Sequence, residues 1–298
     1  MAEITLLDGS IGQELVKRSG DKPTGLWSTQ VMIDHPGLVR DVHASYFETG
    51  ATVATANTYA VLRDRLRRVG IEEHFETLLS TAMTTAKEAR DAAGGGRVAV
   101  SLGPLNASYR PDIFPPAEEA AEVYSEIVAH VKETADLFLI ETVTSLEHAE
   151  GALRATGGHG KPVWLAMSTD DFDGSVFRSG EPLIDAAPIV ASHQVDAVLL
   201  NCSRPEVVAD GLEIIKSFDK PFGAYANGFT KISDGFKKEF PTVDALTQRT
   251  DLGPEPYAAF AMGWVDQGAS IVGGCCEVGP DHIAELARQL RDAGHILV

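Results

Sequence analysis

Cysteine is scarce in this chain of 298 residues, which contains only Cys202, Cys275 and Cys276. The number is odd and two of the three are adjacent, so the chain lacks the paired framework of a small disulfide-rich secreted domain. We therefore expect the three side chains to be reduced thiols.

Basic residues are also few: 25 Lys and Arg stand against 43 Asp and Glu, a net charge of −18. Such a charge repels nucleic-acid phosphates and anionic lipid surfaces, so we expect neither as a partner. No apolar run approaches the roughly 20 residues of a membrane-spanning helix. The first ten residues, MAEITLLDGS, lack the basic and apolar stretches of a secretion signal. The sequence predicts a cytoplasmic protein that acts on small molecules.

Nucleotide-binding glycine loops are missing as well, since neither G-x-G-x-x-G nor G-x-x-x-x-G-K-[ST] occurs. Their absence counts against a doubly wound nucleotide-binding sheet. The chain instead alternates short β-rich runs with stretches of helical spacing, which is typical of βα units around a parallel sheet. Eight strands are expected, at residues 4–7, 52–55, 97–102, 137–140, 163–167, 197–200, 222–224 and 270–272.

Helical spacing fills the intervals between these strands, and several helices begin at prolines or acidic residues. The clearest helices lie at residues 117–134, 146–156, 206–217, 256–267 and 281–293. Eight strands alternating with helices predict an α/β fold with a single (β/α)8 TIM barrel. No linker divides residues 1–298, so we expect one domain. The stretch 228–253 is expected to form a long loop on one barrel face, where such loops often carry function.

Polar side chains follow the predicted strands at their carboxyl ends, where a barrel of this kind builds its active site. Asp8 follows the first strand and Glu141 the fourth. Cys202 follows the sixth strand, and the adjacent cysteines follow the eighth. Further polar or aromatic residues after strands are Asn57, Tyr59, Asn201 and Asn227.

Three cysteines at one rim favour a metal, because cysteines that serve only as small hydrophobic residues are as common inside strands and helices. The glycines of GGCC let both adjacent cysteines turn toward one ion, and Cys202 supplies a third ligand from across the barrel mouth. Zinc accepts thiolates and prefers four ligands, so three protein ligands leave one position open, as in catalytic sites. We expect His282 to be a surface histidine. Buried cysteines without a metal remain the alternative.

Together these residues resemble the homocysteine S-methyltransferase family, zinc-dependent barrels that methylate homocysteine to methionine. The resemblance spans nearly the whole chain and is carried by LLDGSIGQEL, LWSTQVMIDHP, VHASYFETGATVATANTYA, LIETVTS, LLNCSRP and VGGCCEVGPDHI. Its most specific elements are GGCC followed by G-P and the N-C pair after the sixth strand. The resemblance implies an enzyme that methylates the thiol of homocysteine.

The resemblance also implies roles for individual residues. It places zinc ligands at Cys202, Cys275 and Cys276, and it makes Asp8 and Glu141 the carboxylates that hold the homocysteine amino group. This pairing suits the chemistry, since an α-ammonium group needs an anion. Taken alone, Asp8 also fits a turn and Glu141 also fits a helix start.

The methyl donor is less well defined, because the departures from the family pattern fall on donor-side loops, at DGS, GPLNASYRP and AYANG. Trp27 and Tyr59 match positions near the donor. Thr142 stands where betaine-using members carry a tyrosine, which argues against a full aromatic cage for a quaternary ammonium. We expect S-methylmethionine or S-adenosylmethionine, because a sulfonium leaves as a neutral thioether and requires no protonation. Betaine, dimethylsulfoniopropionate and another thiol acceptor are the alternatives.

Two functions of other classes compete with methyl transfer. A metal-dependent hydrolase on the same barrel would normally show hard ligands such as H-x-H, and none of the nine histidines is spaced so. A non-enzymatic zinc- or thiol-binding protein would need the cysteines but not Asp8 and Glu141. The sequence therefore favours zinc-dependent methyl transfer, and it gives no indication of oligomeric state.

Overall fold

A computed structural model of the protein describes residues 1–237 and 245–298. Within these residues the strands form one sheet with the order β2-β3-β4-β5-β6-β7-β8-β1-β9, and neighbouring strands are parallel. Their bounds are β1 Glu3–Leu6, β2 Val53–Thr55, β3 Arg97–Leu102, β4 Leu137–Val143, β5 Val163–Met167, β6 Ala197–Asn201, β7 Phe222–Tyr225, β8 Ile271–Val272 and β9 Ile296–Leu297. The α/β class predicted from the sequence is confirmed.

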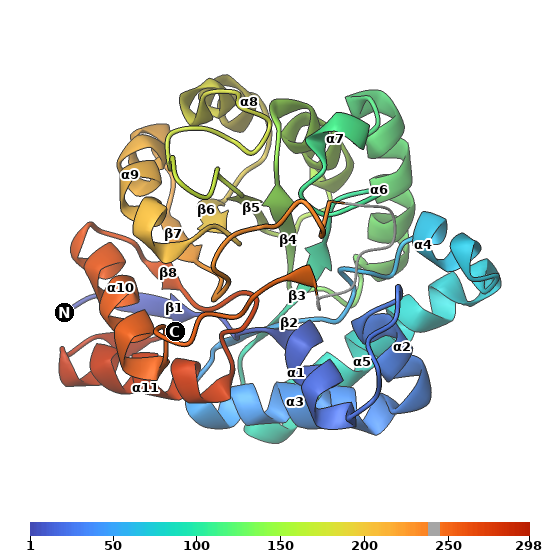
Figure 1. Ribbon diagram of the computed structural model, residues 1–298, viewed down its shortest axis with the longest axis horizontal. Helices are drawn as coiled ribbons and strands as arrows, with labels where there is room; N and C mark the ends of the chain where they lie inside the picture. Colours follow the sequence, from blue (N-terminus) through green and yellow to red (C-terminus); the bar gives the residue numbers. More distant parts are fainter. Residues whose placement is uncertain (238–244) are drawn as a thin grey trace.

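The α-helices lie on the outer side of the curled sheet (Figure 1). Their bounds are α1 Ile11–Ser19, α2 Ser28–Asp34, α3 Pro36–Thr49, α4 Arg63–Arg68, α5 Phe75–Ala93, α6 Ala117–Val131, α7 Leu146–Thr156, α8 Ala187–Ser192, α9 Pro205–Ile215, α10 Pro254–Asp266 and α11 Pro280–Asp292. In α11, Ile283, Leu286 and Leu290 recur at helical spacing and are buried, which fixes the face that packs inward. None of the described helices is long and apolar enough to cross a membrane.

The predicted strands and the five predicted helices all occur, with ends shifted by at most a few residues. The largest difference among the strands is in β4, which continues to Val143 through an irregular register, with Thr142 at a φ of 57°. β9 is absent from the sequence prediction because two residues show no periodicity. It adds a strand beside β1, pairing Ile296 with Glu3.

The two sides of the sheet approach each other between β1 and β2. A parallel bridge joins Leu7 to Val53. The Thr52 N–H donates to the Leu6 carbonyl at 2.7 Å, and the Asp8 N–H donates to the Val53 carbonyl at 3.1 Å. The sheet therefore curls back on itself.

Side-chain alternation divides the core into two layers. Phe138 and Ile140 of β4 belong to the large cluster between sheet and helices. Leu137 and Leu139 belong to a smaller cluster enclosed by the strands. Because successive strand residues point to opposite faces, the next inward position on β4 is Glu141. The same alternation places polar residues above the enclosed cluster on several strands.

Candidate metal centre and substrate cavity

Polar residues at the carboxyl ends of the inner strands form the bottom of a cavity of about 230 Å³. Thr55, Ser101 and Glu141 continue the inward alternation of Val53, Ala99 and Leu139 on their strands, and Tyr225 is itself inward on β7. Asp8 directly follows the bridge residue Leu7. We call the following set the cavity floor: Asp8, Thr55, Ser101, Glu141 and Tyr225.

Glu141 is held from both sides within the floor. The Ser101 hydroxyl donates to its Oε1, and the Tyr225 hydroxyl donates to its Oε2 at 3.0 Å. Burial raises the pKa of Glu141 to about 6, although the two hydrogen bonds oppose this by stabilising the carboxylate. The carboxylate is therefore fixed in position and ionises close to neutral pH.

Asp8 is fixed by a single neighbour, Thr55. The Thr55 N–H donates to Asp8 Oδ2 at 2.6 Å, and the Thr55 hydroxyl donates to Oδ1 at 2.7 Å. Burial raises the pKa of Asp8 to about 7, with a smaller contribution from the charge of Glu141. Two buried carboxyl groups that share one floor suit a bound cation, because the cation would favour their charged forms.

The three cysteines meet above this floor, as the sequence predicts. The Sγ atoms of Cys202, Cys275 and Cys276 all lie within 4.8 Å of one another. Cys276 Sγ is 3.9 Å from Cys202 Sγ and 4.0 Å from Cys275 Sγ. The sulfur of Cys202, which follows β6, and the two sulfurs of the turn after β8 are therefore close enough to hold one ion.

Cys202 and Cys275 are joined in a disulfide, whereas Cys276 is free. The prediction of three reduced thiols is therefore wrong for this pair. The physical reason is proximity, since sulfurs brought together as metal ligands are also close enough to oxidise. A metal centre at this position needs the pair in its reduced form, because thiolates are the ligands.

The glycines of GGCC act differently from the sequence expectation. Neither has a left-handed φ. A Cβ at Gly273 would lie 2.5 Å from Leu7 Cβ, and one at Gly274 would lie 2.2 Å from Val278 Cγ1. Gly273 therefore lets the turn after β8 approach the end of β1, and Gly274 lets this turn fold closely against Val278. The adjacent cysteines of the turn are then held beside the cavity floor.

His282 does not complete the ligand set. Its Nδ1 accepts from the Gly279 N–H at 3.3 Å, and its Nε2 lies 3.1 Å from the Leu252 carbonyl. It is half-buried at the start of α11, not fully on the surface as predicted. A search of the described residues for clusters of His, Cys, Asp or Glu side chains that could hold a metal gives these three cysteines. Three sulfur donors beside an open cavity suit zinc with one position left for a substrate.

Burial, together with smaller contributions from the carboxylates of Glu277 and Glu141, raises the pKa of the Cys276 thiol to about 12. At neutral pH this thiol is therefore protonated unless a cation compensates the charge. A bound metal supplies that compensation, because a coordinated thiol is deprotonated.

Aromatic side chains from loops enclose the upper part of the cavity. Trp27 meets Tyr59 edge to face with ring centroids 6.0 Å apart, and Tyr109 meets Phe236 in the same manner at 5.9 Å. We call the following set the cavity wall: Trp27, Tyr59, Tyr109, Phe229 and Phe236. Thr142 lies in β4, whereas these rings come from loops, so the identity of residue 142 does not decide whether aromatic side chains line the cavity.

Of the three predicted asparagines, one lines the cavity and two do not. Asn57 lines it and donates to the Ser28 carbonyl at 3.2 Å. Asn201 accepts from the Thr142 N–H at 3.0 Å, and Asn227 donates to the Cys202 carbonyl at 2.7 Å. Neither Asn201 nor Asn227 lines the cavity. Their geometry is that of backbone supports, and their substrate contacts stay a prediction.

Several residues of the site were not predicted from the sequence. Strand alternation could have identified Thr55, Ser101 and Tyr225, because each shares the inward parity of its strand. The wall residues Tyr109 and Phe236 lie in irregular loops that carry no periodic signal. The loop predicted at 228–253 does contribute Phe229 and Phe236; residues 238–244 of that stretch lie outside the described residues.

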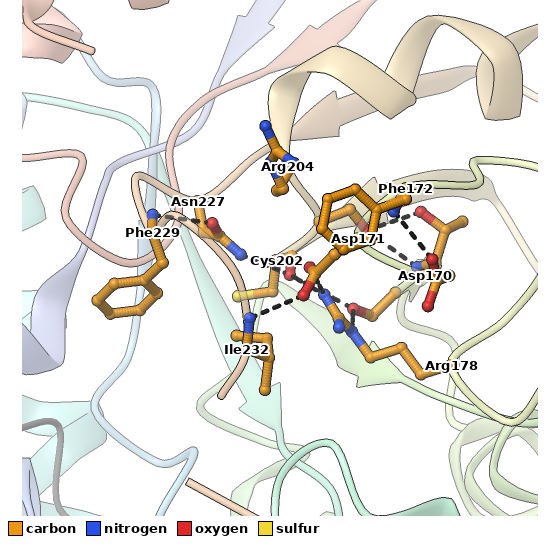
Figure 2. A network of polar contacts seen from close by, with 12 residues as sticks. Asp170, Asp171, Phe172, Arg178, Cys202, Arg204, Asn227, Phe229 and Ile232 are labelled. Atoms are coloured by element: carbon orange, nitrogen blue, oxygen red, sulfur yellow. Dashed lines mark hydrogen bonds and ion pairs between the residues drawn. The ribbon is translucent and has the colours of Figure 1, made fainter. Parts of the chain in front are cut away.

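A buried polar network supports Cys202 on the side away from the cavity floor. Arg178 and Asn227 both donate to its carbonyl, and Asp171 bonds to Arg178 (Figure 2). Neither Asp171 nor Arg178 carries a recognisable sequence motif, and both come from the segment after β5.

Comparisons with known proteins agree with this geometry. The sequence profile of a family described as Homocysteine S-methyltransferase matches residues 5–290. The chain is 26% identical to homocysteine S-methyltransferase YbgG of Bacillus subtilis (strain 168), over 97% of this chain and 95% of the relative. It is 25% identical to selenocysteine Se-methyltransferase of Brassica oleracea var. italica, over 96% and 88% of the two chains.

The fold is also similar to that of a solved enzyme. The metallated form of the homocysteine methyltransferase MmuM from Escherichia coli superposes with a TM-score of 0.81 at 25% identity, covering 96% of each chain. The oxidized form of the same enzyme superposes with a TM-score of 0.81 at 26% identity. Metallated and oxidized states have thus been described for a protein of this fold.

Proposed function

Because the chain belongs to the homocysteine S-methyltransferase family, we propose that it is a zinc enzyme that transfers a methyl group from a sulfonium donor to homocysteine, forming methionine. The observation that carries the proposal is the convergence of Cys202, Cys275 and Cys276 on the cavity that holds the carboxyl groups of Asp8 and Glu141. As a member of an enzyme family, the chain is a methyltransferase, which removes the non-enzymatic alternative.

The three cysteines would hold the zinc ion. When bound, zinc would supply the acidity that converts the incoming thiol to a thiolate at neutral pH, with the thiol proton released to water. The sulfur then attacks the methyl carbon, the carbon–sulfur bond of the sulfonium breaks, and the donor leaves as a neutral thioether with the bond electrons. The protein's residues need only orient the two substrates, an effect worth up to about 7–11 kcal/mol.

Asp8 and Glu141 would bind the α-ammonium group of homocysteine. Both carboxyls are buried and held by Thr55, Ser101 and Tyr225, so they lose little freedom when the ammonium arrives. A buried carboxylate that pairs with an ammonium makes a stronger hydrogen bond than a neutral pair. The floor would therefore fix the acceptor with its sulfur beneath the cysteines.

The cavity wall supports a cationic donor, because aromatic faces attract cations. Arg65 lies over the Tyr59 ring at 5.8 Å and also lines the cavity. Its guanidinium suits a carboxylate. S-methylmethionine combines a sulfonium with a carboxylate and is our preferred donor. S-adenosylmethionine, betaine and dimethylsulfoniopropionate share parts of this chemistry, and the selenium-methylating relative supports a wider range of acceptors.

We further propose that the curled sheet is an eight-stranded barrel closed between β1 and β2, with residues 1–298 as one domain. The Leu7–Val53 bridge supports closure, and β9 then adds to the edge beside β1. A cytoplasmic location stays a prediction from the sequence.

The experiment is a methionine-formation assay with reduced, zinc-loaded protein, homocysteine and four donors: S-methylmethionine, S-adenosylmethionine, betaine and dimethylsulfoniopropionate. We expect one zinc per chain and the fastest methionine formation with S-methylmethionine. The matched control is Cys276→Ser, which should bind less zinc and form no methionine. Reduced protein that takes up no zinc, or that forms no methionine with any donor, would contradict the proposal.

A further inference from the structure

A buried ion pair lies behind the metal centre, outside the substrate cavity. Arg178 Nη2 and Asp171 Oδ1 are 2.8 Å apart, and the two side chains are 7% and 8% exposed. Neither residue directly follows a strand and neither has a place in the proposed methyl transfer. Burying a charged pair is unfavourable unless both groups are fully hydrogen-bonded, so the remaining bonds of the pair indicate what it holds.

Arg178 holds the backbone of a metal ligand. Its Nη2 donates to the Cys202 carbonyl at 3.1 Å, and its Nε donates to Ser168 Oγ at 2.9 Å. Asn227 Nδ2 donates to the same Cys202 carbonyl at 2.7 Å. The guanidinium also lies 4.8 Å from the centre of the Tyr109 ring in the cavity wall. The Ser168 hydroxyl also donates to this carbonyl, at 3.5 Å. The carbonyl of Cys202 is thus fixed by three side chains, two from the segment after β5 and one from the loop after β7.

Cys202 needs such support because its φ is 49°. This left-handed conformation is unfavourable for a residue with a Cβ, and it persists only where the surrounding structure enforces it. Figure 2 shows Arg178 and Asn227 converging on Cys202 from different sides. The conformation that directs the Cys202 sulfur is therefore stabilised by side chains that do not touch the metal position.

Asp171 connects this support to the loop after β7. Its Oδ2 accepts from the Ile232 N–H at 2.7 Å (Figure 2). Ile232 and Cys202 belong to the same small apolar cluster, against which Cys275 and Cys276 pack. The same loop contacts the other two ligands, because the Cys275 N–H donates to the Ala226 carbonyl at 2.9 Å and the Gly228 N–H donates to the Cys276 carbonyl at 2.7 Å.

We propose that Arg178 and Asp171 are positioning residues of the metal centre, which hold Cys202 and residues 226–232 as one rigid unit. The inference rests on the proposed metal site but not on the identity of the methyl donor. It predicts that the pair sets metal affinity and ligand geometry from a distance, in the way that outer partners of metal ligands do.

The test compares Arg178→Lys and Asp171→Asn with the wild-type chain, each reduced and loaded with Co²⁺ as a spectroscopic substitute for zinc. Lysine keeps the charge but cannot reach Cys202, Ser168 and Asp171 at once. Asparagine can still accept from Ile232 but leaves Arg178 without its counter-charge. We expect Co²⁺ affinity, measured by chelator competition, to fall about 10- to 100-fold, and the visible Co²⁺–thiolate absorption to shift.

The matched control is Arg97→Lys. Arg97 is also partly buried and lies 5.3 Å from the Trp164 ring, but it begins β3, at the opposite end from the cavity. It should lower thermal stability without changing Co²⁺ affinity or the absorption spectrum. Folded Arg178→Lys and Asp171→Asn proteins with wild-type affinity and spectrum would overturn the inference.

A second measurement needs no variant, in case the substitutions prevent folding. In the wild-type chain, we expect removal of the metal by a chelator to increase amide hydrogen exchange in residues 226–232 and to leave α6 unchanged. Unchanged exchange in 226–232 would overturn the inference while leaving the metal site intact. A reduced wild-type chain that binds no Co²⁺ would instead overturn the proposed metal site, and this inference with it.

Discussion

The cavity floor and the cavity wall are built in different ways. The floor residues Thr55, Ser101 and Glu141 lie on strands, and their direction follows from strand alternation. The wall residues Tyr109, Phe229 and Phe236 lie in loops, and they are placed by contacts between distant segments. The difference teaches that the floor, our proposed acceptor side, is set by the strands, whereas the wall, our proposed donor side, can vary without changing the sheet.

The largest loss of activity is expected from replacing a proposed metal ligand. Cys276→Ala removes one of three sulfur ligands, so zinc affinity and methionine formation should each fall by more than about 100-fold, the upper effect of losing only an outer partner. Zinc content and initial rates check this, with circular dichroism as the control for folding. A variant with full zinc content would break the assignment of the metal to this position.

Next in size is the loss of a floor carboxylate. Glu141→Gln removes the charge that we propose pairs with the substrate ammonium, a bond worth about 1.5–3 kcal/mol. We expect kcat/KM for homocysteine to fall by about 10- to 100-fold, with little change in the KM of the donor. The control is Glu150→Gln, which alters an acid paired with Arg154 on the outer helix α7. Equal losses for both substrates would remove the distinction between floor and wall.

Acidic pH should also weaken the binding of homocysteine at the cavity floor. Burial raises the pKa of Asp8 to about 7 and that of Glu141 to about 6. Below these values the carboxyls are protonated and cannot pair with an ammonium, so homocysteine affinity should fall as the pH drops from 8 to 5.5, by up to about tenfold per unit for each group titrating. The KM for homocysteine as a function of pH checks this. In Glu141→Gln the lower of the two steps should disappear.

The smallest effect is expected in the wall. Phe236→Ala removes one aromatic face from a cationic donor, worth about 0.5–2 kcal/mol, so the KM for S-methylmethionine should rise several-fold while that for homocysteine stays unchanged. Phe172→Ala is the matched control, because Phe172 is 70% exposed and does not line the cavity. A rise in the KM for homocysteine alone would reverse the assignment of floor and wall.

The same contrast explains what could be predicted from the sequence. Asp8, Glu141 and the cysteines follow the ends of the predicted strands at once or within a few residues, so a strand assignment was enough to bring them to one rim. Asn201 satisfies the same rule, yet its side-chain oxygen accepts from the Thr142 N–H, at the point where the register of β4 is irregular. Tyr109, Arg178 and Asp171 could not be predicted, since their contacts join loops separated by many residues and leave no local pattern.

The oxidation state could not be predicted either. An odd cysteine count argues against a disulfide framework, but it says nothing about two ligands brought together by the fold. Here Cys202 and Cys275 are joined, although no sequence spacing distinguishes them from the free Cys276.

Cys202 and Cys275 are separated by 73 residues, and the curled sheet brings them together only after β6, β7 and β8 have paired. Such long-range contacts form late in folding, because loop-closure entropy opposes them. An ion that binds only the finished arrangement stabilises it by mass action. The concentration of metal during synthesis should therefore affect the yield of folded protein if the proposed site is filled. This effect does not depend on whether the methylation reaction is needed.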